Sequence, residues 1–130
     1  MGRRRASGGN APLNAPLPPQ WAEQLTADRL EESGWRVLAR NYRLRGGELD
    51  LVCQDEDGVI VFVEVKQRRS DAYGGAGAAI DARKLRRLRR TAAHYLAYEL
   101  KSSEAAARFD AVLISGSAAK HSFEHLRDAW

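Results

Sequence analysis

Three residues near the middle of the chain have the types and spacing of a metal-dependent catalytic site. Asp50 lies in the segment ELDLVCQ, and Glu64 and Lys66 follow fourteen and sixteen residues later in VIVFVEVKQ. If these segments pair as antiparallel strands with residue numbers that sum to 114, Asp50 faces Glu64. The same register places Glu48 opposite Lys66, and the four polar side chains then share one face. Opposed side chains have their Cβ atoms about 5 Å apart, so the two acids would be neighbours.

Two carboxylates so close on a largely buried strand pair repel each other, and the conflict is resolved by a raised pKa or a bound cation. Mg²⁺ suits such a site, because it takes one or two protein carboxylates and keeps several waters. Lys66 returns to the same face, where its ammonium group would hold a scissile phosphate or the attacking water. The pattern therefore predicts metal-dependent chemistry on a phosphate. The competing interpretation is a buried ion pair between Glu64 and Lys66 that only balances charge.

The helices and strands that must position these residues can be predicted from apolar periodicity. Residues 21–33 suit a short amphipathic helix that stops at Gly34, and a second helix is expected from about 79 to 101. Alternating or continuous apolar residues predict the strands, which are 35–42, 48–54, 59–67, 108–115 and, as a candidate, 121–126. This order of elements predicts an α/β sandwich, with a central mixed sheet of four to five strands flanked by helices.

Alternation within the strands predicts which side chains face the site. The second strand divides into an apolar face and a mixed face, namely Leu49, Leu51 and Cys53 against Glu48, Asp50 and Val52. The third strand is apolar on both faces, as central strands are, and Glu64 and Lys66 continue the face of its even-numbered residues, Ile60 and Phe62. Glu23 lies seven residues before Leu30, at the edge of the first helix's buried stripe.

The distribution of charge indicates a polyanionic partner. The net charge is +4, residues 36–45 hold four arginines without an acid, and residues 66–90 hold nine basic residues against two acids. In the second helix, four arginines are expected on the side opposite the apolar stripe: Arg83, Arg86, Arg87 and Arg90. A basic surface around embedded acids favours nucleic acid held near a metal. The alternative interpretation is a solvated basic face.

Other features limit the class of protein. A chain of 130 residues has room for one domain, which we place at 20–130, after a basic, Pro-rich tail at 1–19 that we expect to be disordered. The lone Cys53 excludes an internal disulfide and fits a reduced, cytoplasmic setting. No run approaches about 18 apolar residues, so no membrane span is expected. His121 and His125 match the letters H-x-x-E-H of zinc peptidases, but we interpret them as surface or strand residues.

A longer set of motifs carries a family resemblance. The segment GGELDLVCQDEDGVIVFVEVKQRR, with YGG and a helix bearing Lys84 behind it, resembles the YraN family of bacterial nuclease-like proteins. That family is part of the PD-(D/E)xK, or restriction-endonuclease-like, superfamily, so the resemblance implies a restriction-endonuclease-like three-layer sandwich. It covers about residues 20–130 and includes WAEQLTADRLEESGW, ARNYR, RFDAVLI and LRDAW. Two departures, Gln67 in place of a small or hydroxyl residue and a YGGAG loop without proline, concern loop shape.

The resemblance also implies roles for individual residues. Asp50 matches the metal aspartate of the superfamily, Glu64 its second acidic ligand and Lys66 its catalytic lysine. Glu23 matches the helical glutamate that resolvase-like members add to the site. Together with the backbone carbonyl of Val65, the two acidic ligands would hold Mg²⁺ or Mn²⁺. Two further positions are typical of the family with roles left open, namely Glu48 and Lys84.

These observations predict a Mg²⁺-dependent endonuclease that hydrolyses phosphodiester bonds in DNA, branched or damaged DNA by analogy with resolvases. The residues expected to contact nucleic acid are Arg43, Arg45, Arg68, Arg69, Tyr73, Arg83, Lys84 and Arg87. Two alternatives stay open: a catalytically weak nucleic-acid-binding module of the same fold, and an accessory protein whose basic helix docks an acidic partner. A homodimer also fits the sequence.

Overall fold

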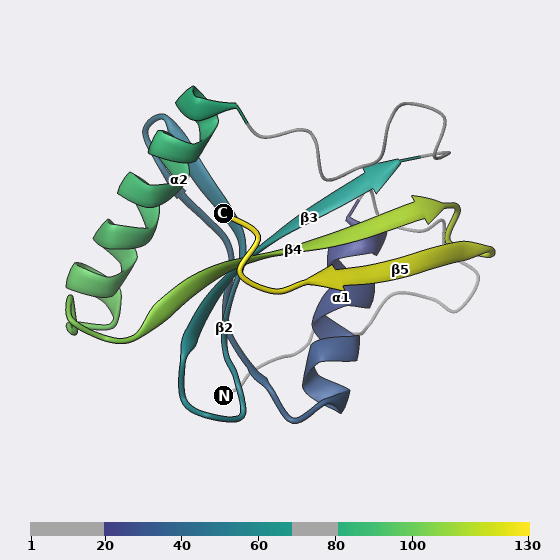
Figure 1. Cartoon of the computed structure of the whole chain (residues 1–130), viewed down its shortest axis with the longest axis horizontal. Coiled ribbons are helices and arrows are strands. Elements are labelled where there is room, and N and C mark those ends of the chain that lie inside the picture. The colour runs from purple at the N-terminus through teal and green to yellow at the C-terminus, as the bar shows by residue number, and fades with distance from the viewer. Residues whose placement is uncertain (1–19, 69–80) are drawn as a thin grey trace.

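One mixed sheet of five strands carries a helix on each face (Figure 1). The computed structural model describes residues 20–68 and 81–130, so the tail expected at 1–19, the YGGAG loop, Arg69 and Tyr73 lie outside the described residues. Within the described residues, the predicted α/β fold with a central mixed sheet flanked by helices is confirmed.

The strands follow one another across the sheet in the order of the sequence. They are β1 (Arg36–Leu44), β2 (Gly47–Gln54), β3 (Ile60–Arg68), β4 (Ala107–Gly116) and β5 (His121–Leu126). All neighbours are antiparallel except β3 and β4, which are parallel. Parallel neighbours need a crossover connection, and here the crossover contains the second helix. The candidate fifth strand is confirmed as β5, and the H-x-x-E-H letters, His121–His125, lie on this strand rather than on a helix.

The helices are α1 (Trp21–Glu32) and α2 (Ala82–His94), and a π-helical turn, η2 (Tyr95–Glu99), continues α2. Helix α1 ends before Gly34, whose φ of +95° suits a left-handed cap. Asp81 caps α2 by accepting a hydrogen bond from the Lys84 N–H at 2.8 Å. The sequence predicts one uninterrupted helix here; the π turn instead forms where the buried Tyr95 ring packs edge-on against neighbouring aromatic rings. In the described part of the chain, no helix is long and apolar enough to cross a membrane.

Two apolar clusters hold the helices against the sheet. The cluster under α1 contains Val61 and Val63, with Val65 packed against it, and the cluster under α2 contains Ile60 and Phe62, as the alternation predicts. Leu49 differs from the prediction, because it joins the cluster under α2 and not the one that holds Leu51 and Cys53. Beyond Leu51, β2 no longer pairs with β3, and this outer end of the β1–β2 hairpin packs on α2. Because Leu49 lies in the outer end, its side chain joins the cluster under α2.

Candidate active site

The site lies where β2 and β3 separate. The two strands pair in the predicted register over residues 51–54 and 60–63. The next pair in that register, Asp50 and Glu64, does not belong to the ladder. Instead, Oδ2 of Asp50 accepts a hydrogen bond from the backbone N–H of Val65 at 2.8 Å. A carboxylate thus takes the place of a strand–strand hydrogen bond, and the strands part at this point.

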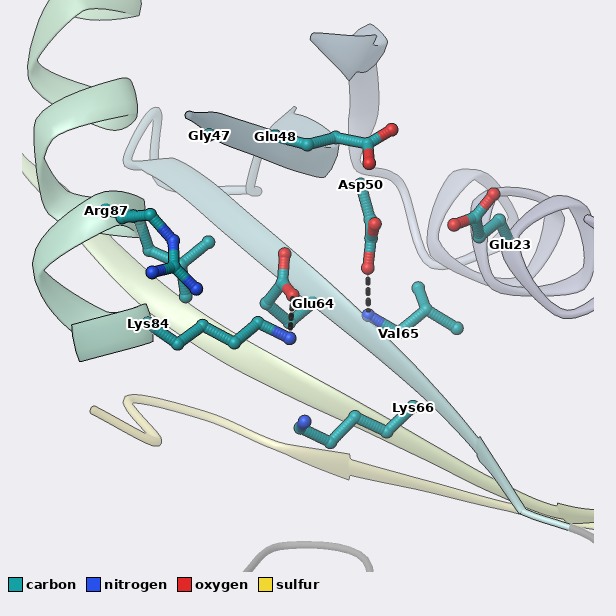
Figure 2. A pocket seen from close by; sticks show the side chains of 10 residues that line it. Glu23, Gly47, Glu48, Asp50, Glu64, Val65, Lys66, Lys84 and Arg87 are labelled. Carbon is teal, nitrogen blue, oxygen red and sulfur yellow. Dashed lines mark hydrogen bonds and ion pairs between the residues drawn. The ribbon is translucent and has the colours of Figure 1, made fainter. Parts of the chain in front are cut away.

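A cavity of about 350 Å³, which we call the acid pocket, opens at this separation (Figure 2). Its walls come from α1, β2, β3 and α2, and its lining residues are Glu23, Gly47, Glu48, Asp50, Glu64, Val65, Lys66, Lys84, Arg87 and Leu88. The structure therefore brings the four residues predicted to be catalytic, Glu23, Asp50, Glu64 and Lys66, to a single pocket.

The two central acids of the pocket are poorly stabilised as carboxylates. Burial, followed by the charge of Asp50, raises the pKa of Glu64 to about 7. Burial likewise raises the pKa of Asp50, although its hydrogen bond from the Val65 N–H acts in the opposite direction. Two adjacent acids removed from water disfavour each other's ionisation, which is the conflict expected from their spacing. A cation placed between them would remove it.

Two lysines approach Glu64 from different elements. The Lys84 ammonium, on the first turn of α2, lies 3.7 Å from Oε1 of Glu64. Lys66, two residues further along β3, points toward the same cavity (Figure 2). Burial, followed by the charge of Lys84, lowers the pKa of Lys66. The sequence predicts Lys84 as a nucleic-acid contact, at a position typical of the family whose role is left open. In the structure, it is the ion-pair partner of Glu64, which is predicted to be a metal ligand. The expected alternative, an ion pair between Glu64 and Lys66, is not the pair that the structure forms.

Glu23 reaches the pocket from the opposite layer, as its place at the edge of the α1 stripe predicts (Figure 2). Burial, followed by the charge of Asp50, raises its pKa to about 6. Its Oε1 atom is buried and has no hydrogen-bond partner among the described residues. Buried polar oxygens are rarely left unpaired, so this atom marks a place where a water, proton or ion is expected.

The arginines predicted to contact nucleic acid divide into different settings. Arg87 lines the acid pocket, whereas Arg43 forms an exposed ion pair with Glu48 at 2.9 Å. Arg45 and Arg83 are exposed, and Arg68 is partly buried near the end of β3. Of these five, one arginine thus shares the pocket with the acids.

A second acidic group has a structural explanation. Asp55, Glu56 and Asp57 are, within residues 20–68 and 81–130, the one group of three potential metal ligands with all ligand atoms within 4.8 Å of one another. The carboxylate of Asp55, however, accepts hydrogen bonds from the N–H groups of Asp57 and Val59 at 2.8 and 2.9 Å, and from Arg108 at 2.6 Å. These hydrogen bonds stabilise the β2–β3 turn and use both carboxylate oxygens of Asp55 as acceptors. Glu23, Asp50 and Glu64 are more widely spaced.

Two features beside the pocket were not predicted. Gly47 lies so close to α2 that a Cβ atom there would overlap the Thr91 hydroxyl, so the glycine allows the hairpin to dock on the helix. The sequence marks this glycine as a break but does not reveal its contact. Asn41, between the β1–β2 pairs Arg40–Leu51 and Tyr42–Leu49, has a φ of +52°. Asparagine tolerates this left-handed conformation, and the residue lines a second cavity of about 230 Å³ beside Glu23 and Asp50.

Comparison with known proteins places this chain in a family. The model of the uncharacterised protein family UPF0102 matches residues 22–114, a range that holds every acid and lysine of the pocket. A UPF0102 protein of Paracidovorax citrulli is 53% identical over 100 residues, covering 75% of this chain and 73% of the relative. One of Dechloromonas aromatica is 50% identical over 105 residues (78% and 84%). One of Methylococcus capsulatus is 42% identical over 123 residues (95% and 94%). The chain therefore belongs to the UPF0102 family, which is the YraN family that its motifs resemble.

Proposed function

We propose that this protein is a metal-dependent endonuclease that hydrolyses phosphodiester bonds in DNA, and that its fold is a member of the PD-(D/E)xK superfamily. The observation that carries the proposal is the acid pocket. Asp50 and Glu64 lie where β2 and β3 separate, and the pKa values of both carboxyl groups are raised. Lys66, on β3 like Glu64, lines the same pocket. Acids with perturbed pKa values in a cleft are typical of functional sites, because catalysis needs carboxyl groups whose pKa values burial and neighbouring charges have shifted.

The residues of the pocket fit a hard divalent cation such as Mg²⁺ or Mn²⁺. Carboxylate and carbonyl oxygens are the ligands that these ions prefer, and Asp50, Glu64 and the Val65 carbonyl would supply them. The unpaired buried oxygen of Glu23 adds a further acceptor at the edge of the pocket. When bound, such an ion neutralises charge on a phosphate and makes water a better nucleophile near neutral pH.

The chain's own groups have separate tasks in this proposal. The Val65 N–H fixes the Asp50 carboxylate, and Lys84 holds the Glu64 carboxylate from the side of α2. Lys66 places a positive charge where a non-bridging phosphate oxygen or the attacking water would sit. Glu23, with its pKa of about 6, accepts a proton from water near neutral pH. In the reaction, a water oxygen bonds to phosphorus, one P–O ester bond breaks, and the leaving oxygen takes up a proton.

The test is cleavage of branched, flapped, single-stranded and duplex DNA in Mg²⁺ or Mn²⁺ by the wild type and by Lys66→Ala. We expect the variant to lose cleavage while its affinity for DNA stays within a few fold, because one phosphate contact among several is lost. The matched control is Lys120→Ala, which removes the same charge from the exposed β4–β5 turn and should cut like the wild type. Equal cleavage by Lys66→Ala and the wild type would contradict the proposal.

The two alternative functions give different results in the same assay. A catalytically weak binding module would bind these substrates without cutting any of them in either ion. An accessory protein for an acidic partner would neither cut DNA nor prefer it to an acidic polypeptide. Catalysis is favoured over both because the acid, acid and lysine set is complete and gathered in one pocket.

A further inference from the structure

A basic and aromatic ridge runs along one side of α2 and into η2. Residues 82–94 contain six lysines and arginines and no Asp or Glu. On a helix, residues three or four positions apart lie on the same side. One such row is continuous through both elements: Arg83, Arg87, Arg90, His94 and Tyr98. We call this row the α2 ridge.

The α2 ridge borders the β1–β2 hairpin and meets the acid pocket at Arg87. Arg87 lines the pocket (Figure 2), and the Arg90 guanidinium lies beside Gly46, where a Cβ atom would be 2.9 Å from Nη2. One turn further, Nδ1 of His94 and the Tyr42 hydroxyl share a hydrogen bond of 2.9 Å. Arg87 and Tyr98 are eleven residues apart, which corresponds to about 16 Å along the helix at 1.5 Å per residue.

The far end of the α2 ridge is an aromatic platform. The His94 and Tyr98 rings lie 4.4 Å apart between centroids, at an angle of 34°. The Tyr42 hydroxyl holds the His94 ring and also donates to Oε2 of Glu99 at 3.4 Å. Tyr98 is 66% exposed, the one exposed large hydrophobic side chain of residues 20–68 and 81–130. Its position in a π turn adds weight, because such turns occur frequently at functional sites.

We propose that the α2 ridge binds a single-stranded segment of nucleic acid, which it leads from the acid pocket to a base stacked on Tyr98. The inference rests on the proposed function, since it names the form of the substrate on one side of the pocket. Arginines that follow a backbone, joined to an aromatic face, are the combination that proteins use for single strands. A duplex offers phosphates but keeps its base faces inside the stack. An acidic protein surface would use the arginines and leave Tyr98 without a task.

The first test measures binding in EDTA, so that no cleavage occurs, with a labelled oligonucleotide either alone or in a duplex. Stacking is worth about 1–3 kcal/mol per base. Tyr98→Ala should therefore weaken single-strand binding by about 5- to 150-fold and change duplex binding by less than about twofold. Tyr98→Phe keeps the ring and should retain most of the single-strand affinity. An unchanged single-strand affinity in Tyr98→Ala, or an equal loss for both forms, would overturn the inference.

The second test compares two arginines of the same helix. Arg90→Ala removes a cation from the α2 ridge, and Arg89→Ala removes one that the helical spacing places off the ridge, toward the other side. For single strands, each lost phosphate contact reduces the slope of log K against log salt by about 0.7. We expect this reduction for Arg90→Ala alone. Equal slopes in the two variants, or competition by polyglutamate as effective as that by unlabelled oligonucleotide, would overturn the inference.

Failure of this inference can be distinguished from failure of the proposed function. If the wild type cleaves DNA but Tyr98→Ala binds single strands as tightly as the wild type, single-strand binding by the α2 ridge is contradicted and the nuclease activity is supported. Single-strand binding that depends on Tyr98 and Arg90, without cleavage in Mg²⁺ or Mn²⁺, would support the ridge and contradict the nuclease.

Discussion

Buried acids gather at two places on this sheet, and the two places differ in what neutralises the acids. In the acid pocket, burial and mutual repulsion raise the pKa values of the carboxyl groups. The second place is the Arg108 network, made up of Arg108, Asp55, Asp110 and His125. There, Arg108 donates to Asp55 at 2.6 Å and to Asp110 at 2.9 Å, and His125 lies 2.8 Å from Asp110.

Burial acts on the acids of the Arg108 network as well, yet their pKa values are lowered. For Asp110, the hydrogen bonds from His125 and Arg108 outweigh burial, and for Asp55 those from Arg108 and two backbone N–H groups do so. The buried acids of the Arg108 network are thus fully paired, and their hydrogen bonds join β4, β5 and the β2–β3 turn. In the acid pocket, the ion pair from Lys84 to Glu64 does not outweigh burial, and the pKa of Glu64 stays raised. Such local conflicts are expected at functional sites.

The largest expected effect comes from breaking the Arg108 network. Asp110 has no exposed surface, and Asp110→Ala would leave the largely buried Arg108 with Asp55 alone as its acid partner. The variant would also remove the acceptor of His125 and of the Asp128 N–H. Removing one member of a buried pair costs about 3–5 kcal/mol. The free energy of unfolding in urea should fall by this amount, whereas Glu124→Ala, at an exposed position of β5, should change it by less than about 0.5 kcal/mol. A loss below about 1 kcal/mol for Asp110→Ala would remove the contrast between the two places.

The central part of the pocket could be predicted from the sequence because it depends on neighbouring strands. Alternation and a short loop fix the β2–β3 register, and that register brings Asp50, Glu64 and Lys66 together. Glu23 follows from the periodicity of one helix. The partner of Glu64 could not be predicted in the same way, since the approach of Lys84 depends on how α2 lies across the sheet.

Bends and long-range polar contacts also lie beyond periodicity. The ladder between β2 and β3 ends before Asp50, and the hairpin beyond that point turns toward α2, which moves Leu49 to the other cluster. The Arg108 network joins residues that are up to 53 positions apart. No local pattern encodes such pairs, because the sequences of the β2–β3 turn, β4 and β5 would each form the same element without them. The fold class follows from the order of elements, and these contacts follow from its packing.

The second largest effect should come from divalent ions, which act on the acid pocket and not on the Arg108 network. A ligand at a hundredfold excess over its dissociation constant stabilises the folded state by about 2.7 kcal/mol. Mn²⁺ should therefore raise the free energy of unfolding of the wild type by this amount, and Asp50→Asn should abolish the gain. The control is Asp57→Asn, at an exposed position of the β2–β3 turn. Loss of the gain in that variant, with its retention in Asp50→Asn, would place the ion at the turn.

Without metal, the two places should respond to pH in opposite directions. The pKa of Glu64 is about 7 in the folded chain against an ordinary 4.5, so the folded state binds more protons and loses stability as the pH rises from about 4.5 to 7. The acids of the Arg108 network have lowered pKa values, so their contribution is lost as the pH falls below about 4.

The decline between pH 4.5 and 7 should amount to about 1–2 kcal/mol, since one unit of pKa difference is worth about 1.4 kcal/mol and solvent in the open pocket screens the repulsion. Urea unfolding across this range measures it, and Glu64→Gln should reduce the decline to the part that Glu23 and Asp50 contribute. A stability that rises from pH 4.5 to 7 in both the wild type and Glu64→Gln would show that the pocket acids are compensated like those of the Arg108 network.

The smallest effect is expected for Glu48→Gln, at the outer edge of the acid pocket. Glu48 forms an exposed ion pair with Arg43 at 2.9 Å, and such pairs contribute about 0–1 kcal/mol. Its charge also raises the pKa values of Glu23 and Asp50, so the substitution removes a weak attraction and a weak repulsion together. The net change in the free energy of unfolding should stay within about 0.5 kcal/mol.

The same variant decides whether Glu48 is a ligand or a peripheral charge. As a charge held by Arg43 outside the metal ligands, it should alter the Mn²⁺ dissociation constant by less than about threefold, since solvent and salt screen exposed groups. Arg43→Gln, the matched control, would free Glu48 and change the affinity by a similarly small factor in the opposite direction. A loss of Mn²⁺ affinity of about tenfold or more in Glu48→Gln would contradict this, because only a direct ligand contributes so much. The acid pocket would then hold its ion with Glu48 in addition to Asp50 and Glu64, and Arg43 would compete with the metal for Glu48.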